Sequence, residues 1–242
     1  MTTLFISDLH LEESRPDITR ALLHFLKDKA TGAERLYILG DFFEAWIGDD
    51  EHTPLQDEIA AALRGLSDRG TELFLMHGNR DFLIGEDFCK RIGGQLLEDP
   101  TVVDLYGTPT LLMHGDSLCT ADVEYQKFRT TMRNRQWQEM FLKRPLEDRQ
   151  TTARQLREIS MAKNKGKEMA IMDVTPDEVV KAMEEYGVQR LIHGHTHRPA
   201  THDLEANGQP AQRMVLGDWD RSIWWIEAST DQPPALKQQP LQ

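Results

Sequence analysis

The sequence predicts an α/β fold whose strands end in short polar loops. Hydrophobic runs of two to four residues recur along the 242-residue chain, and amphipathic helical segments lie between several of them. Asp, His or Asn follows each run within a few residues. Hydrophobic residues make up 39% of the chain and charged residues 28%, which is typical of a globular protein. The length suits one large domain, or a domain that carries an insertion.

The first two predicted strands are residues 4–6 and 36–39. Asp8 and His10 follow the first strand, and Asp41 follows the second. Asp8 and His10 are two residues apart, so an extended chain would point both side chains the same way. These three residues are therefore candidates for a shared polar site.

Helices are expected near residues 18–26 and 57–67, because apolar side chains recur there on one face. The segment 42–50 lies between the second strand and the second helix and is unusually aromatic for a solvent loop. Either another element covers this segment, or it contacts an apolar ligand.

Three further strands are predicted at residues 73–76, 110–113 and 191–192. Polar residues follow each of them in turn: Asn79 and Arg80, then His114, then His193, His195 and His197. Open α/β sheets build their sites from loops at strand ends. We therefore expect these loops to meet the loops that carry Asp8, His10 and Asp41.

Residues 121–170 interrupt this pattern, and their apolar spacing predicts a helical hairpin whose first helix ends at Pro145. Residues 124–168 hold 12 Lys/Arg and 6 Asp/Glu, a net charge of +6. The whole chain carries −12, so the remainder carries −18. This basic insertion either faces an anion, such as phosphate or an acidic membrane surface, or is a solvated helical face.

The expected organisation is a core of residues 1–120 and 171–230, the insertion of 121–170 and a loose tail of 231–242. Thr175 and Pro176 predict the start of a helix that ends at Gly187. Residues 213–217 and 222–227 are expected to form a closing strand pair.

The composition also indicates a compartment and excludes some partners. Cys89 and Cys119 form no Cys-x-x-Cys pair and are expected to be ordinary thiols in a reducing compartment. The chain has no apolar run long enough for a membrane span and no signal-peptide pattern, so cytoplasmic residence is expected. The net charge of −12 argues against binding nucleic acid.

Seven residues are candidate metal ligands: Asp8, His10, Asp41, Asn79, His114, His195 and His197. Carboxylate, amide and imidazole groups without cysteine suit Mn²⁺, Fe²⁺, Zn²⁺ or Mg²⁺. Seven ligands exceed the needs of one ion, so a two-metal site with a bridging carboxylate is expected. Asp41 is the expected bridge, because it lies between the two groups in the sequence.

Five motifs together resemble the signature of the calcineurin-like metallophosphoesterases. They are Asp8-x-His10, Gly40-Asp41, Gly78-Asn79-Arg80-Asp81, His114-Gly115-Asp116 and Gly194-His195-Thr196-His197. Each is weak alone, but the five occur in this order at strand ends. The resemblance spans residues 5–217. It implies a four-layer αββα sandwich with a dinuclear metal centre that hydrolyses phosphoesters or pyrophosphates.

Longer segments resemble the members of that family that act in lipid A biosynthesis. The segments are residues 6–11, 40–50, 78–83, 170–174 and 194–199, together with the basic insertion. The resemblance implies cleavage of the pyrophosphate of UDP-2,3-diacylglucosamine, by metal-activated water at the α-phosphorus, to UMP and 2,3-diacylglucosamine 1-phosphate (lipid X). It further implies two Mn²⁺ ions, a monomer and peripheral association with the cytoplasmic face of the inner membrane.

The resemblance also implies roles for single residues. Asp8, His10, Asp41 and His197 would hold one metal ion, and Asp41, Asn79, His114 and His195 the other. The implied substrate contacts are Asn79, Arg80, Asp122, Ser160, Asn164, Lys167 and His195. Asn79, Arg80 and Asp41 are the implied catalytic residues.

Other readings remain open from the sequence. Arg80 would be a plain surface residue if it paired with Asp81. The chain could act on a soluble substrate as a phosphodiesterase or nucleotide pyrophosphatase. A non-catalytic scaffold is disfavoured because all seven candidate ligands are present, and a nuclease is disfavoured by the acidic body.

Overall fold

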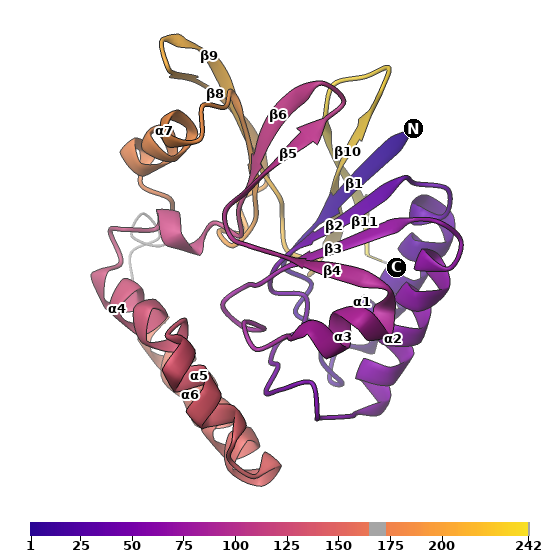
Figure 1. Cartoon of the computed structure of the whole chain (residues 1–242), viewed down its shortest axis with the longest axis vertical. Helices are drawn as coiled ribbons and strands as arrows, with labels where there is room; N and C mark the ends of the chain where they lie inside the picture. Colours follow the sequence, from indigo (N-terminus) through magenta and orange to yellow (C-terminus); the bar gives the residue numbers. More distant parts are fainter. Residues whose placement is uncertain (165–172, 242) are drawn as a thin grey trace.

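A computed structural model describes residues 1–164 and 173–241, without the side chains of residues 160–164. Two sheets pack face to face (Figure 1). The first sheet has the order β11 (Ala235–Pro240), β10 (Ser222–Ser229), β1 (Thr2–Ile6), β2 (Arg35–Leu39), β3 (Glu72–Met76) and β4 (Gly94–Leu97). The second has the order β5 (Thr101–Leu105), β6 (Thr108–Leu112), β7 (Arg190–His193), β9 (Gln209–Val215) and β8 (Ala200–Ala206).

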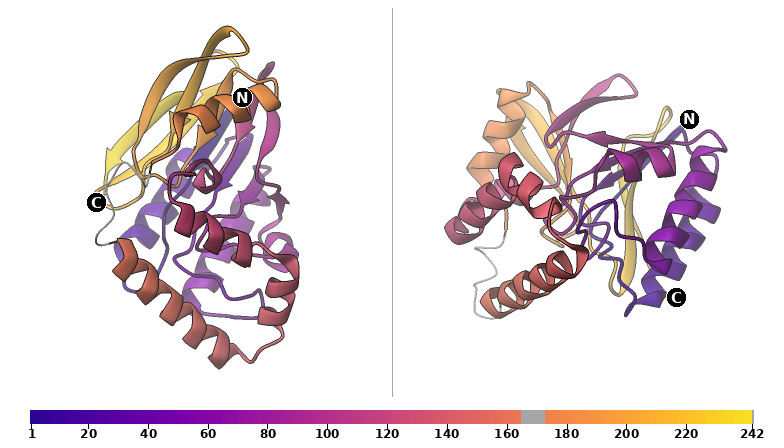
Figure 2. Two further views of the ribbon diagram at one scale, coloured as in Figure 1. Left: turned by 90° about the vertical axis from the view of Figure 1, so that its left-hand side faces the viewer. Right: turned by 60° about the horizontal axis from the view of Figure 1, so that its bottom comes forward.

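Helices cover the outer faces of both sheets, which gives four layers (Figure 2). The first sheet packs against α1 (Pro16–Phe25), α2 (Pro54–Ser67) and α3 (Glu86–Ile92). A π-helical turn (Leu26–Ala30) extends α1. The second sheet packs against α7 (Pro176–Glu185). The predicted four-layer αββα sandwich is therefore confirmed.

Alternation along the central strands explains this layering. Leu4 and Ile6 of β1 belong to the hydrophobic core under the first set of helices, whereas Phe5 belongs to the core between the sheets. Successive strand side chains point to opposite faces, so a strand that is apolar on both faces must be covered on both. Strands β1, β2 and β3 pair in parallel, which places their carboxyl ends at one edge.

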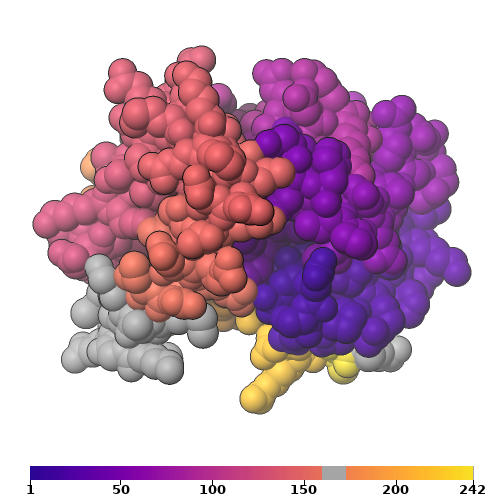
Figure 3. Space-filling view, turned by 90° about the horizontal axis from the view of Figure 1, so that it is seen from below, coloured from indigo at the N-terminus to yellow at the C-terminus, as the bar shows by residue number. Residues whose placement is uncertain are grey.

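Three helices follow β6 and a short 3₁₀ turn (Asp116–Leu118) and precede α7: α4 (Val123–Met132), α5 (Arg135–Leu142) and α6 (Leu146–Asn164). We call these three helices the cap. The two-helix hairpin that the spacing predicted is wrong, because the Asn134 side chain accepts a hydrogen bond from the Trp137 amide at 3.0 Å and starts a new helix. Figure 3 shows the cap and the core side by side on one face.

Two expectations for the C-terminal region are also wrong. Strands β9 and β10 do not pair with each other: β9 lies between β7 and β8 in the second sheet, and β10 pairs with β1 in the first. The expected loose tail contains β11, which pairs with β10 along six residues as an edge strand. Its polar sequence hid this strand, because an edge strand that faces solvent needs no apolar alternation.

Both cysteines should be inert in the folded protein. Cys89 and Cys119 are buried, and burial raises the pKa of each thiol to about 12. Because the thiolate is the reactive form, we expect a chromogenic disulfide reagent at pH 8 to label the native chain at least about 100-fold more slowly than the unfolded chain. Parallel absorbance traces with and without guanidinium chloride measure this ratio. Equal rates would contradict the burial of both thiols.

Candidate metal centre

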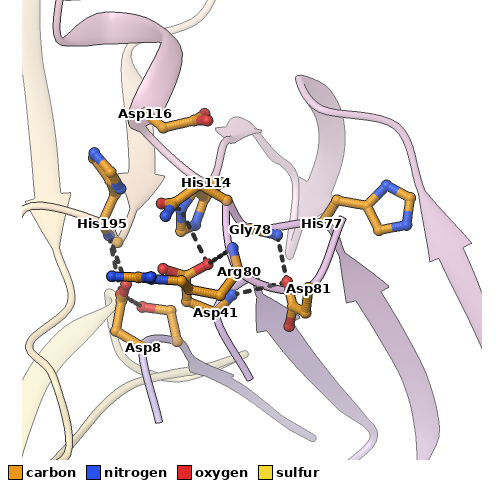
Figure 4. A network of polar contacts seen from close by, with 12 residues as sticks. Asp8, Asp41, His77, Gly78, Arg80, Asp81, His114, Asp116 and His195 are labelled. Atoms are coloured by element: carbon orange, nitrogen blue, oxygen red, sulfur yellow. Dashed lines mark hydrogen bonds and ion pairs between the residues drawn. The ribbon is translucent and has the colours of Figure 1, made fainter. Parts of the chain in front are cut away.

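Six of the seven candidate ligands form two neighbouring clusters at the loop ends of the sandwich. One cluster contains Asp8, His10 and His197, and the other contains Asp41, His114 and His195. In each cluster the candidate ligand atoms lie within 4.8 Å of one another. Figure 4 shows Asp8, Asp41, His114 and His195 gathered from separate loops. The strand ends therefore bring together residues that are up to 189 positions apart in the sequence.

Asp41 lies between the clusters, and Asn79 completes the second. One carboxylate oxygen of Asp41 is 3.8 Å from His10 Nε2, and the other is 3.8 Å from His114 Nε2. The Asn79 side-chain oxygen is 3.2 Å from His114 Nε2. This arrangement suits the bridging position expected for Asp41. The role of these residues as ligands stays a prediction.

The donor set fits divalent cations. His114 Nδ1 lies 2.9 Å from the carbonyl oxygen of Leu39, and because a carbonyl only accepts, Nδ1 carries the proton. In the neutral ring the Nε2 lone pair is therefore left to face the cluster, as a metal ligand requires. Oxygen and imidazole donors without a thiol suit Mn²⁺, Fe²⁺, Zn²⁺ or Mg²⁺.

The electrostatics of the site is dominated by burial and by close opposite charges. Burial opposes ionisation of Asp8, but its hydrogen bond and charge interaction with His197 lower its pKa. Burial likewise opposes protonation of His114, yet the carboxylates of Asp41, Asp116 and Asp8 raise its pKa to about 9. Burial lowers the pKa of His195 to about 3. His195 is therefore neutral at pH 7, the form that binds metals.

An unusual backbone aims several of these side chains. Asp8, His10, Asp41, His195 and His197 have φ between 49° and 67°, in the left-handed region. The extended conformation expected for Asp8 and His10 is therefore wrong, although both still join one cluster. Asp, Asn and His tolerate this region better than other side chains, and such strain concentrates at functional sites.

Two glycines allow the loops to approach closely enough. A Cβ atom at Gly78 would lie 2.1 Å from the Asp41 amide nitrogen, and one at Gly194 would lie 2.2 Å from an Asp8 carboxylate oxygen. Both distances are far below van der Waals contact. Each glycine is therefore required by close packing of a neighbouring loop on the clusters.

Asp81 is a positioning residue to which the sequence reasoning assigned no role. Its side chain is buried and accepts hydrogen bonds from the backbone amides of Gly78 at 2.8 Å, Asp41 at 3.2 Å and Phe42 at 2.8 Å (Figure 4). One carboxylate thus ties the loop after β2 to the loop after β3. Arg80 points elsewhere, with its guanidinium 3.8 Å from Glu44, so the alternative of an Arg80–Asp81 pair is not supported by the described contacts.

Asp116 connects the cap to the second cluster. Its buried carboxylate accepts hydrogen bonds from the Tyr125 hydroxyl at 2.7 Å and Arg129 Nε at 2.8 Å, both on α4. The Tyr125 ring stacks on the His195 ring, with 5.8 Å between centroids. The sequence placed Asp116 in a motif but could not show that its partners come from the insertion.

An apolar pocket lies between the cap and the core, and three of its lining residues contact the clusters: Glu44 contacts His10, Asn79 contacts His114, and Tyr125 contacts His195. Its empty volume is about 1040 Å³, part of which is open to solvent. The apolar lining comes from Trp46, Ile47, Phe82 and Leu83 of the core and from Phe128, Trp137, Phe141, Leu156 and Ile159 of the cap. The polar lining comes from Glu44, Asn79, Arg80, Glu124, Tyr125 and Arg157. The aromatic segment 42–50 is thus covered by another element, and it also lines the pocket.

Four further residues predicted to contact the substrate lie at the start and near the end of the insertion: Asp122, Ser160, Asn164 and Lys167. The Asp122 side chain caps α4 by accepting a hydrogen bond from the Tyr125 amide at 3.1 Å. Lys167 and the side chains of Ser160 and Asn164 lie outside the described residues. In the part of the chain that is described, no helix combines the length and the apolar composition that a membrane crossing requires.

Comparisons with known proteins agree with this geometry. A family model described as "Calcineurin-like phosphoesterase" matches residues 1–199. A protein of Marinobacter nauticus named UDP-2,3-diacylglucosamine hydrolase is 75% identical over 241 residues, covering 100% of this chain and 99% of that protein. Proteins of the same name from Ectopseudomonas mendocina and Hahella chejuensis are 62% and 58% identical. The alignment with the Ectopseudomonas mendocina protein covers 93% of each chain, and the alignment with the Hahella chejuensis protein covers 96% of this chain and 95% of that protein.

A solved structure described as a novel archaeal phosphodiesterase superposes with a TM-score of 0.52 at 12% sequence identity. The match covers 100% of both chains. At this identity the likeness concerns the fold alone.

Proposed function

Because this chain belongs to the calcineurin-like phosphoesterase family, we propose that it hydrolyses the pyrophosphate bond of UDP-2,3-diacylglucosamine. The products are UMP and 2,3-diacylglucosamine 1-phosphate (lipid X), an intermediate of lipid A biosynthesis. The full-length similarity to proteins that carry this name supports the assignment. The observation that carries it is the pocket, whose polar lining residues contact the two clusters and whose other walls are apolar. The substrate is an amphiphile, so its pyrophosphate matches the polar lining of the pocket and its two acyl chains match the apolar walls.

Two divalent cations complete the site in this proposal, and Mn²⁺ is the ion we infer. Asp8, His10, Asp41 and His197 would hold one ion, and Asp41, Asn79, His114 and His195 the other. Such ions supply Lewis-acid activation of water and charge neutralisation when they are bound.

The chain's own groups bind and orient the pyrophosphate. Arg80 presents a planar fork of donors at the polar end of the pocket, where it can bind phosphoryl oxygens and stabilise the charge that gathers on them. Asn79 lines the same end and offers an amide N–H. The bond that breaks joins the α-phosphorus to the bridging oxygen. The oxygen of water therefore ends in UMP, and the bridging oxygen leaves with lipid X.

The apolar part of the pocket would receive the acyl chains of the substrate. A substrate with two acyl chains resides in a bilayer, so the enzyme must reach a membrane surface to bind it. We infer that the chain acts as a monomer, peripherally at the cytoplasmic face of the inner membrane. The net positive charge of the insertion suits an anionic lipid surface. Asp122, Ser160, Asn164 and Lys167 are proposed as further substrate contacts from the family resemblance.

The direct test is product analysis with UDP-2,3-diacylglucosamine in ¹⁸O-labelled water. We expect UMP and lipid X, with the label in UMP. Label in lipid X would contradict attack at the α-phosphorus. Equal rates on UDP-sugars or dinucleotides would favour a phosphodiesterase or pyrophosphatase for soluble substrates. Removal of divalent ions by a chelator should abolish turnover, and Mn²⁺ should restore it.

Removing one aromatic wall of the pocket should weaken lipid binding. Trp137 of α5 packs on Phe141 with stacked rings 5.0 Å apart and lies near Phe82 of the core. We expect Trp137→Ala to raise KM about tenfold, because roughly 1–2 kcal/mol of apolar contact is lost. Steady-state kinetics with long-chain and short-chain substrates measure this effect, which should shrink as the acyl chains shorten. Tyr186→Ala, at an exposed aromatic residue after α7, is the matched control. An increase in KM that is the same for long-chain and short-chain substrates would contradict binding of the acyl chains in this pocket.

A further inference from the structure

Glu44 lies where the loops of the core meet the cap, and the proposed reaction gives it no role. Its backbone is fixed by pairing of two loops: the Leu11 amide donates to the Phe42 carbonyl at 2.9 Å, and the Glu44 amide donates to the Leu11 carbonyl at 3.1 Å. The loop after β2 is thereby held against the loop after β1. The Glu44 side chain is only 12% exposed, although it is charged. A nearly buried carboxylate needs partners that compensate its lost hydration.

Three partners come from three different parts of the molecule. One carboxylate oxygen lies 2.8 Å from His10 Nδ1, in the first cluster. The other oxygen lies 3.0 Å from Arg157 Nε, on helix α6 of the cap, and 3.8 Å from an Nη atom of Arg80. Arg157 also contacts Glu12 at 3.0 Å. Glu44 is thus shared by a candidate metal ligand, a candidate catalytic residue and the cap.

The contact with His10 determines how its imidazole faces the cluster. A carboxylate accepts, so His10 Nδ1 donates the proton and Nε2 carries the lone pair in the neutral ring. Nε2 lies 3.8 Å from Asp41 and 3.3 Å from His197 Nε2, inside the cluster. Carboxylates behind a metal-bound imidazole fix its tautomer and orientation, and their loss typically costs 10- to 100-fold in metal affinity.

The contacts with the two arginines determine the charge at the polar end of the pocket. Arg80 and Arg157 both line that end, and two guanidinium groups there repel each other. A carboxylate between them reduces this repulsion and holds both side chains in place. Arg157 also attaches α6 to the core through this carboxylate, so the position of the cap and the orientation of His10 depend on the same group.

We propose that Glu44 is a positioning residue that couples the cap to the metal centre: it orients His10 for a metal ion and holds Arg157, and with it helix α6, against the core. Coupling between two sites is reciprocal. A substitution of Arg157 should therefore lower the affinity of the centre for the metal ion, although Arg157 contacts no candidate ligand directly in the described interactions. The role of Arg157 toward the substrate rests on the proposed function, whereas the effect on metal binding does not.

The test is calorimetric titration of the metal-free, full-length chain with Mn²⁺. We expect Glu44→Ala to weaken binding of the ion about 10- to 100-fold. Glu44→Gln keeps an oxygen that accepts from His10 but loses the charge, so its loss should be smaller. Arg157→Gln should weaken binding a few-fold.

The double variant Glu44→Ala/Arg157→Gln should bind no more weakly than Glu44→Ala alone, because both changes act through one carboxylate. Arg154→Gln, at an exposed arginine of the same helix, should match the wild type.

Kinetics supply the second readout. Glu44→Gln at saturating Mn²⁺ should recover kcat toward the wild-type value while KM stays raised, because added metal compensates a poorly oriented His10 but not a displaced Arg157. Wild-type Mn²⁺ affinity in a folded Glu44→Ala variant would overturn the proposal. So would unaltered affinity in Arg157→Gln, or additive losses in the double variant. If Glu44→Ala does not fold, Glu44→Gln and Arg157→Gln still decide the question. The titration contains no substrate, so an error in the proposed substrate would leave its result unaffected.

Discussion

Replacing Arg80 by alanine is expected to lower the turnover of UDP-2,3-diacylglucosamine by two to three orders of magnitude while the bound metal stays at the wild-type level. The backbone amide of Arg80 donates to Asp41 at 2.8 Å, and alanine keeps this contact. The guanidinium, which lines the polar end of the pocket, is the only group lost. Losing one preorganised donor to developing charge typically costs about 10²–10³ in kcat.

Two further variants separate charge from geometry at this position. Arg80→Lys keeps the charge but not the planar fork, so its turnover should fall between those of the wild type and Arg80→Ala. Arg64→Ala, at an exposed arginine paired with Asp68, should turn over substrate normally. Metal content by atomic emission and kcat by UMP release are the measurements. Unchanged turnover in Arg80→Ala would remove Arg80 from the mechanism.

Asp81→Ala is expected to cost both stability and activity. The buried carboxylate accepts hydrogen bonds from four backbone N–H groups of the two loops that carry Asp41 and Asn79. Charge-assisted hydrogen bonds contribute about 1.5–3 kcal/mol each, and donors left unpaired add a desolvation penalty. We expect the free energy of unfolding to fall by about 3–5 kcal/mol and kcat to fall at least about 100-fold, because both loops lose their common support.

Urea denaturation followed by circular dichroism, with metal content and kcat measured in parallel, tests this expectation. Asp81→Asn retains one acceptor oxygen and should lie between the wild type and Asp81→Ala. Asp87→Asn is the matched control, because Asp87 is exposed on α3 and contacts only Lys90 in the described ion pairs. A stable Asp81→Ala variant that lacks metal would show that Asp81 serves the centre alone. A stable variant with wild-type metal content would refute the support role.

The sequence was sufficient for the layers and for the convergence of the candidate ligands. Strands such as residues 4–6 and 36–39 are apolar on both faces, so they had to be central, and parallel central strands bring their following loops to one edge. This inference needs only the apolar pattern within each strand and the residues that follow it. It holds for Asp8, Asp41 and His114 because each directly follows such a strand.

What the sequence could not show depends on contacts between distant residues. Asp81 and Asp116 stand in two of the five motifs and Glu44 stands in the aromatic segment 42–50, but the motifs do not show the partners of these acids, which lie up to 113 positions away. Edge strand β11 lacks apolar alternation, and β9 and β10 resemble a hairpin because they are neighbours in sequence. The cap was predicted as helical, but its break at Asn134 depends on one capping contact.

The left-handed backbone at Asp8, His10, Asp41, His195 and His197 restricts evolution and engineering alike. A replacement at these positions must supply a donor atom and also tolerate a conformation that costs most L-residues about 1–2 kcal/mol. Asparagine meets the conformational demand, whereas β-branched residues do not. Asn79 and His114 are not among the residues with positive φ, so this restriction does not apply to them. Attempts to retune the preference of the centre for one cation over another should therefore begin at these two positions.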